Sequence, residues 1–218
     1  MPDALMVSSS FLPGRGGIET YLAELCTALA PRLAVLAPAR RGRERIPEDL
    51  PHETRGYEGR LFVPGPRAAR ATVEAARSLG TDRVLFGTPW PQVLTAPRLS
   101  RAGLRYASIV HGAELLVPAA IPAVRGRLLR ALAGADLLLP VSLFTAQRLR
   151  DLLEGAGMRV PPMAVLRARV DLERFHPGAG GDAARARYGI APGAPMIVCL
   201  GRMVARKGLD RLIAALPE

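Results

Sequence analysis

The 218-residue sequence contains a single lysine, Lys207, no asparagine and only two cysteines. The cysteines, Cys26 and Cys199, lie far apart and build no disulfide framework, which favours a reducing cytosol. The N-terminus has neither the basic region nor the apolar run of a signal peptide. Arginines interrupt the most apolar stretch, residues 115–142, so no run of 18 uncharged apolar residues occurs. We therefore expect a soluble or peripheral protein rather than a membrane-spanning one.

Aromatic residues are also scarce, at 5%, although the chain is strongly basic, with 30 basic and 19 acidic side chains and a formal charge of +11. All the basic residues but one are arginine, and lysine and asparagine have A/T-rich codons, so part of this charge reflects a G+C-rich genome. A basic chain still favours anionic partners such as phosphates, acidic lipids or nucleic acid. Because the arginines are dispersed and stacking residues are few, we expect no nucleic-acid partner.

Short apolar runs alternate with amphipathic segments along residues 1–166. Parallel strands covered on both faces have such continuous apolar sequences, so the pattern predicts a doubly wound, Rossmann-like α/β domain. Residues 38–51, which are rich in arginine and proline, are predicted to form a mobile surface loop. Strands are expected at 4–9, 33–37, 61–64, 83–87, 106–110, 136–141 and 163–166, and helices at about 21–30, 68–79, 93–101, 122–133 and 143–153.

The composition changes after residue 170. We assign residues 1–170 to the first domain, the proline- and glycine-rich residues 171–193 to a linker, and residues 194–218 to the start of a second domain. That last segment is predicted to hold a strand at 195–200 and a helix ending at 215. Twenty-five residues do not make a core, so either this unit joins the first sheet or the chain is a fragment of a two-domain protein. We favour the fragment.

A glycine-rich turn, Gly14–Glu19, follows the first expected strand and opens the first helix. Glycine lets a backbone approach a ligand closely, and a helix start offers free N–H groups, so Gly16 and Gly17 are candidates for an anion or sugar site. The turn is no dinucleotide fingerprint, because Glu19 stands where the third glycine should fall. A tight turn that needs glycine only for its geometry is an equal alternative.

His111, in the sequence His-Gly-Ala-Glu, directly follows the expected strand at 106–110. The carboxyl ends of parallel strands are where α/β sheets bind ligands, and a histidine there can contact a substrate hydroxyl. Taken alone, a loop histidine that only satisfies a hydrogen bond is the more common case. The spacing does not match a zinc-binding helix.

A third candidate is the basic turn Gly201–Gly208, which follows the expected strand at 195–200. Arg202 and Lys207 lie five residues apart across the turn, so that a guanidinium fork and an ammonium group could face one pair of phosphates. The turn is no Walker loop. The alternative is a basic turn that is only solvated. This alternative is less favoured because the only lysine of the chain falls in the turn.

Other chemistry has little support in the sequence. No Gly-x-Ser-x-Gly elbow and no Cys-x-x-Cys pair occur, so neither a nucleophilic hydrolase nor a metal site is expected. The helix at 122–133 carries Arg125, Arg127 and Arg130 beside leucines and could rest on an anionic membrane. An amphipathic surface helix with solvated arginines is the favoured interpretation.

Taken in order, these motifs resemble the family 4 glycosyltransferases, retaining enzymes with two Rossmann-like domains in the GT-B arrangement, and in particular the phosphatidylinositol mannosyltransferases. The segments that carry the resemblance are GGIE, HGAE, VSLFTAQRLRDLL, VDLERFHP and GRMVARKGLDRLIAAL, which span nearly the whole chain. The resemblance implies a nucleotide-diphospho-sugar donor bound mainly by the second domain and a lipid-linked or saccharide acceptor bound mainly by the first. It also implies a cytoplasmic protein, peripheral at the inner face of the cell membrane, with that anionic surface as a partner.

The resemblance also implies roles for single residues. Gly201, Arg202 and Lys207 match positions that hold the donor diphosphate, where the two cations offset charge on the leaving group without a metal or other cofactor. His111 matches a histidine that contacts the transferred sugar. The remaining matches belong to the same sugar and acceptor site: Gly16 and Gly17 of the glycine loop, and Glu114 of the HGAE motif. The implied reaction is hexosyl or mannosyl transfer with retention, by front-face attack through an oxocarbenium-like transition state.

Two features depart from the family pattern. Arg169 stands where a glycine usually precedes the Val170-Asp171 pair, and the acidic Glu-x7-Glu motif would lie beyond residue 218. We therefore expect the N-terminal portion of such an enzyme, with reduced or no activity on its own. The alternative is a complete, non-catalytic α/β module that binds a sugar or lipid phosphate without turning it over.

Overall fold

The computed structural model describes residues 1–58, 63–201 and 203–216, except for the side chains of Glu114, Leu116, Val117 and Arg206. The chain divides into two compact units, Met1–Arg169 and Val170–Glu218. This division falls at the sequence Arg169-Val170-Asp171, one residue from the expected end of the first domain.

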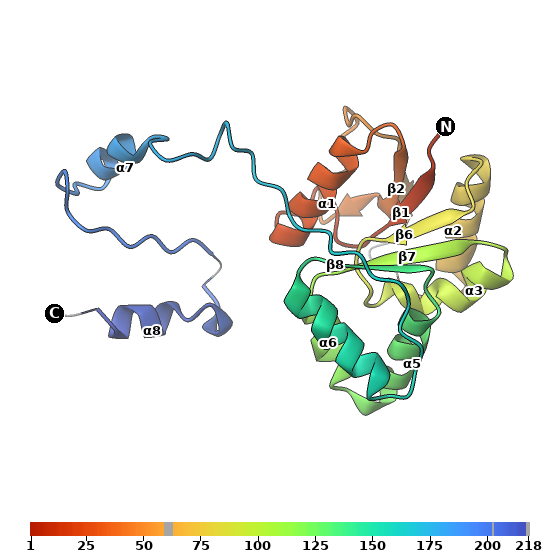
Figure 1. The fold of residues 1–218 in the computed structure, drawn as a ribbon. Coiled ribbons are helices and arrows are strands. Elements are labelled where there is room, and N and C mark those ends of the chain that lie inside the picture. Colours follow the sequence, from red (N-terminus) through yellow and green to blue (C-terminus); the bar gives the residue numbers. More distant parts are fainter. Residues whose placement is uncertain (59–62, 202, 217–218) are drawn as a thin grey trace. The chain divides into compact units, whose positions relative to one another are not determined.

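The first unit is built on one six-stranded parallel sheet (Figure 1). Its strand order is β5-β2-β1-β6-β7-β8, which is the 3-2-1-4-5-6 order of a doubly wound fold once the small β3–β4 hairpin is set aside. Leu5 of β1 pairs with Ala34 of β2 on one side and with Val84 of β6 on the other. The strands are β1 (Ala4–Val7), β2 (Leu33–Pro38), β5 (Thr54–Tyr57), β6 (Arg83–Phe86), β7 (Arg105–Val110) and β8 (Leu137–Pro140).

Helices cover both faces of this sheet; Figure 1 shows α1 on one side and α2 and α3 on the other. Side chains of α2, α3, α5 and α6 join the larger core cluster, and those of α1 join a smaller one on the opposite face. This two-sided burial is why the strands are apolar at nearly every position. The helices are α1 (Gly17–Ala28), α2 (Pro66–Ser78), α3 (Ala96–Arg101), α4 (Ala113–Ala119), α5 (Pro122–Ala133) and α6 (Leu143–Glu154).

The sequence predicted the fold class and most elements of the first unit, with three corrections. The third strand is Thr54–Tyr57 rather than 61–64; residues 61 and 62 lie outside the described residues, and 63–64 are not in a strand. This strand lies at the edge of the sheet and contains Arg55, which lines a groove beside α2. The strand therefore lacks the apolar run by which the other strands were predicted. Residues 38–51 are not simply a mobile loop, because they form the hairpin of β3 (Arg40–Arg41) and β4 (Glu44–Arg45) and pack Ile46 and Leu50 onto the smaller core.

The third correction concerns three segments whose secondary structure differs from the prediction. Helix α4 was not expected, since Pro118 lies inside it, and the helix expected at 93–101 is divided into the 3-10 turn η1 (Gln92–Thr95) and α3. The strand expected at 163–166 is reduced to one bridge, Leu138 to Met163. The segment still runs beside β8, since the Ala164 and Leu166 amides donate to the carbonyls of Leu138 and Pro140.

The second unit contains α7 (Gly181–Arg187), the 3-10 turn η2 (Ala205–Lys207) and α8 (Leu209–Ala214). The strand predicted at 195–200 is not formed. Ile197, Val198 and Leu200 are 67%, 73% and 96% exposed, and no neighbouring strand in the described part of this unit offers a hydrogen-bonding edge. An apolar run needs such an edge and a covered face to become a strand, which explains the difference. The assignment of residues 171–193 to a linker and 194–218 to a second domain stays a prediction.

Candidate functional site

His111 lies at the carboxyl edge of the sheet, immediately after β7. Its Nε2 is 3.0 Å from the carbonyl oxygen of Gly87, which follows the neighbouring strand β6. Since a carbonyl only accepts, this nitrogen carries the proton in that contact. The ring of Tyr21 packs edge-on against the imidazole, with 5.2 Å between ring centroids. These contacts fix the histidine close to the point where the strand order reverses, between β1 and β6, which is where doubly wound sheets bind ligands.

Two glycines make this arrangement possible. Gly87 lies so close to β1 and α1 that a Cβ there would be 2.8 Å from Leu22 Cδ1 and 2.8 Å from Ser8 Cβ. Gly112, which follows His111, has a φ of +127°, a conformation that side chains of L-residues rarely adopt. The glycine of the His-Gly pair is therefore required by the turn that leads from β7 into α4.

Tyr21 is a site residue that the sequence analysis did not identify; it placed this position only in the first expected helix. Its hydroxyl donates to the carbonyl oxygen of Leu166 at 3.0 Å, and burial raises the pKa of this phenol. Tyr21 thus joins α1 to the segment beside β8 and presents its ring to His111. No local sequence signal marks this role, because the partners are 90 and 145 residues away and meet only through the sheet order.

The glycine turn between β1 and α1 closes around an ion pair. Glu19, whose side chain is 13% exposed, accepts a hydrogen bond from Nη1 of Arg41 at 2.9 Å. A Cβ on Gly14 would collide with that guanidinium, and one on Gly16 would collide with the Glu19 carboxylate. A Cβ on Gly17, by contrast, would have no neighbour within 4 Å, so the first residue of α1 faces open space. Gly14 and Gly16 make room for the ion pair, and Gly17 leaves the backbone at the helix start accessible.

Beneath this edge, buried polar side chains link the loops that follow β1 and β6. Thr88 Oγ1 donates to Gln92 Oε1 at 3.1 Å, and the Gln92 amide donates to the hydroxyl of Ser9. Gln92 is fully buried. A buried network in which each polar group has a partner holds its backbone rigidly. No pattern in the sequence indicates this network, because Thr88 and Gln92 flank the short proline-rich stretch 89–91, which has no periodicity.

The basic turn of the second unit brings Lys207 alongside Gly201. A Cβ on Gly201 would be 3.8 Å from both Cδ and Cε of Lys207, so the aliphatic stem of the lysine lies over the glycine. Lys207 is exposed at the end of η2, and Gly208 has a φ of +66° before α8 begins. Arg202 lies outside the described residues, as does the side chain of Glu114.

The structure therefore shows two separate groups of candidate residues. Gly16, Gly17 and His111 belong to the first unit, and Gly201 and Lys207 belong to the second. Within the described side chains, no cluster of three histidine, cysteine, aspartate or glutamate residues could hold a metal ion. No helix in the described part of the chain has the length and apolar character needed to cross a bilayer.

A sequence profile of Glycosyltransferase Family 4 matches residues 15–174, which include Gly16, Gly17, His111 and the Val170-Asp171 motif. This chain belongs to glycosyltransferase family 4. The resemblance identified from the motifs is thereby confirmed. The profile ends before Gly201, so this match does not depend on the basic turn.

Curated relatives extend the similarity over nearly the whole chain. A GDP-mannose-dependent α-(1-6)-phosphatidylinositol monomannoside mannosyltransferase of Mycolicibacterium smegmatis is 34% identical over 98% of the chain. A GDP-mannose-dependent mannosyltransferase of Corynebacterium glutamicum, which acts on the monoacylated lipid, is 30% identical over 98% of it. The chain spans 56% of the length of each relative. The second unit is thus included in the alignment, and with it the Gly201–Lys207 turn.

Solved structures show the same fold. The Anabaena protein HepE, in complex with UDP, matches 87% of the chain with a TM-score of 0.60 at 16% identity, over 50% of its own length. A glycosyltransferase from Rickettsia africae matches 97% of the chain with a TM-score of 0.60 at 15% identity, over 56% of its own length. These similarities confirm the Rossmann-like α/β fold of a family 4 member. The roles of His111, Glu114, Arg202, Lys207 and the site glycines stay predictions.

Proposed function

We propose that this chain is the acceptor-side part of a transferase that moves a mannosyl or other hexosyl group from a nucleotide-diphospho-sugar to a lipid or saccharide acceptor. The observation that carries this proposal is the 34% identity over 98% of the chain to a GDP-mannose-dependent mannosyltransferase that acts on a phosphatidylinositol mannoside. GDP-mannose is accordingly the first donor to test, and a phosphatidylinositol mannoside is the first acceptor.

His111 is proposed to contact the transferred sugar. The contacts with Gly87 and Tyr21 support this role, because they fix the imidazole at the ligand-binding edge before any substrate arrives. A preoriented group loses little freedom when it engages a sugar hydroxyl, and such positioning contributes to catalysis. The open space beside Gly17 supports a substrate position at this edge of the sheet, because a Cβ on Gly17, at the start of α1, would have no neighbour within 4 Å.

Lys207 and Arg202 are proposed to hold the diphosphate of the donor and to stabilise negative charge as it develops on the leaving group. The packing of Lys207 over Gly201 supports this, because it places the only lysine of the chain at the glycine of the same turn. Cations aimed at a developing charge lower the barrier to its formation. We propose transfer with retention, without a metal, by front-face attack through an oxocarbenium-like transition state.

The lipid acceptors of the relatives suggest where in the cell this protein acts. The relatives named above act on phosphatidylinositol lipids, which reside in membranes. We therefore propose that the protein works in the cytoplasm, peripheral at the inner face of the cell membrane. The basic charge of the chain supports attraction to an anionic surface.

The proposal is tested on the protein encoded by the complete reading frame that contains these residues. The purified protein is incubated with radiolabelled GDP-mannose or UDP-glucose and with a phosphatidylinositol mannoside, and lipid products are separated by thin-layer chromatography. Label in the lipid fraction from at least one donor is the expected result. Binding of donor or acceptor without any transfer would favour the non-catalytic module instead, and absence of both binding and transfer would refute the sugar-site assignment.

A further inference from the structure

A surface pocket of about 640 Å³ lies between α3 and α5, on the face of the sheet opposite α1. Its walls carry three guanidinium groups: Arg98 from α3, and Arg127 and Arg130 from α5. Residues three apart on a helix lie on the same side, so the two arginines of α5 point in the same direction. The pocket is separate from the ligand-binding edge, since none of its lining residues belongs to the glycine turn or to the His111 turn.

The charged side chains among the described lining residues of this pocket are all positive. None of its described lining residues is an aspartate or glutamate, and none of its three arginines forms an ion pair with a described side chain. Like charges repel, so a pocket lined by three arginines and no carboxylate favours an anion over a cation. This feature distinguishes the pocket from a second arginine-lined hollow of the first unit.

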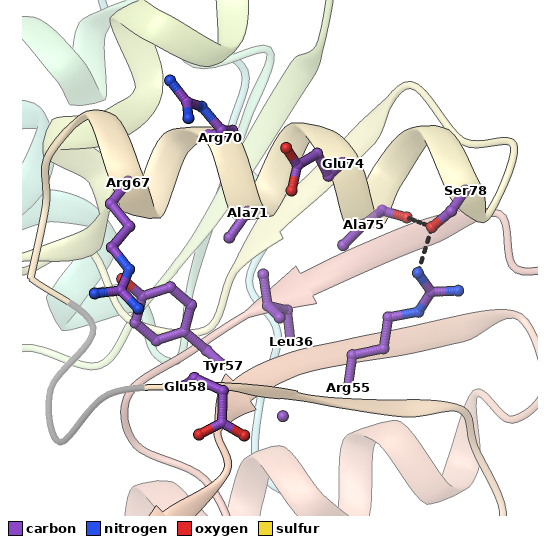
Figure 2. A pocket seen from close by; sticks show the side chains of 11 residues that line it. Leu36, Arg55, Tyr57, Glu58, Arg67, Arg70, Ala71, Glu74, Ala75 and Ser78 are labelled. Atoms are coloured by element: carbon purple, nitrogen blue, oxygen red, sulfur yellow. Dashed lines mark hydrogen bonds between the residues drawn. The ribbon is translucent and has the colours of Figure 1, made fainter.

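That other hollow is a groove of about 630 Å³ between α2 and β5, shown in Figure 2. Arg67 and Arg70 share it with Glu58 and Glu74, and its third arginine, Arg55, is bonded to Ser78 (dashed in Figure 2). Arg55 also donates to a carboxylate outside the groove, that of Glu53, at 2.8 Å. The arginines of this groove therefore have acidic neighbours within the chain, and the groove offers a matched control.

The floor of the α3–α5 pocket is rigid and polar. Tyr106 donates its hydroxyl to the carbonyl oxygen of Ala131 at 2.6 Å, which fixes the ring against α5. Burial is the main reason that the pKa of this phenol is raised to about 12, so the ring adds no negative charge at neutral pH. The guanidinium of Arg130 lies along its own helix, with both Nη atoms 3.7 Å from the place of a Cβ on Gly126. Ser100 also lines the pocket and is a residue that can form a further hydrogen bond.

We propose that the α3–α5 pocket binds a phosphate-bearing ligand, held by the guanidinium groups of Arg98, Arg127 and Arg130. Planar guanidinium groups donate two parallel hydrogen bonds to phosphate oxygens, so three of them suit a dianionic phosphate monoester or a diphosphate. Two sources supply this chemistry: a free phosphorylated metabolite and the headgroup of an anionic lipid. The site goes beyond the proposed sugar transfer, because none of its described lining residues is among those assigned to donor or acceptor.

The test compares two double variants of the full chain, Arg127→Gln with Arg130→Gln in the pocket, and Arg67→Gln with Arg70→Gln in the groove. Both pairs are exposed, so both variants are expected to fold, which thermal unfolding verifies. Pyrophosphate binding is measured by calorimetry in a Lys207→Gln background, which weakens the other predicted diphosphate site. Flotation with phosphatidylglycerol vesicles, against phosphatidylcholine vesicles, measures binding to lipid headgroups.

We expect the pocket variant to lose about tenfold or more in affinity in at least one arm, while the groove variant stays within about twofold of the parent. Loss in the pyrophosphate arm identifies a free phosphate ligand, and loss in the vesicle arm alone identifies a lipid headgroup. Equal losses in both variants, an unchanged pocket variant, or no binding of either probe by the parent would each overturn the proposal. Sugar transfer is not the readout, so these outcomes are independent of the proposed enzymatic function.

Discussion

Replacing Gly87 by alanine tests how the sheet supports His111. The added methyl group would lie 2.8 Å from Cβ of Ser8 and 2.8 Å from Cδ1 of Leu22, both fully buried, so neither neighbour can move without displacing the core between β1 and α1. Overpacking of this kind costs about 1–3 kcal/mol. For a chain of this size, we expect the unfolding temperature to fall by about 2–10 °C.

A matched substitution, Gly126→Ala, has the opposite expected sign. The atoms nearest to a Cβ there belong to the guanidinium of Arg130, at 3.7 Å or more, which is ordinary van der Waals contact within α5. Alanine in a helix interior stabilises by about 0.5–1 kcal/mol relative to glycine. Thermal unfolding followed by circular dichroism measures both variants. If Gly87→Ala unfolds at the temperature of the parent, the packing described for this edge of the sheet is wrong.

Three further predictions concern single side chains. Ser142→Ala removes the acceptor for the Thr145 amide at the start of α6, so we expect a loss of about 1 kcal/mol in urea unfolding, with Ser142→Asp largely restoring it. Burial lowers the pKa of His52 from 6.5, and its Nε2 has no hydrogen-bond partner in the described part of the chain. The contribution of His52 to the free energy of unfolding should therefore be complete above pH 6.5 and decrease on acidification below it, because His52 takes up a proton more readily in the unfolded chain than in the folded one. A His52→Leu variant that loses the same stability in acid would contradict this. In the complete protein, Lys207→Ala should reduce transfer about 100-fold or more, whereas Lys207→Arg should keep part of it, and unchanged turnover in Lys207→Ala would exclude the assigned role.

The fold of the first unit could be predicted because its strands are buried on both faces. Runs such as Leu33–Pro38 and Arg105–Val110 are apolar enough to be recognised alone, and α5 begins and ends at the predicted residues because Pro122 starts it and Gly134 follows it. Edge strand Thr54–Tyr57 was missed, since an edge position tolerates Arg55 and Gly56 and its stability comes from pairing with β2. Residues 195–200 show the reverse case, in which an apolar run lacks a partner edge.

The candidate site was predicted only where its residues are close in sequence. His111 and the glycine turn were identified because they directly follow apolar strands, and strand ends meet at one edge of a parallel sheet. Tyr21 and Arg41 were missed, because their contacts with His111 and Glu19 depend on how α1 and the 38–51 segment fold back over the sheet. Such long-range contacts leave no periodicity that a single sequence displays.

The edge of the sheet around His111 is proposed to hold the sugar that a family 4 transferase moves, and the roles proposed for His111, Gly16 and Gly17 depend on this. The most direct test is the rate of mannose transfer from GDP-mannose to a phosphatidylinositol mannoside by the complete protein and by its His111→Ala variant. Thermal unfolding confirms that the variant is folded. We predict that kcat/KM falls by about 100-fold or more, as for loss of a positioned group that acts in the transition state. A His111→Ala protein that transfers mannose at the parent rate would contradict the proposed sugar site.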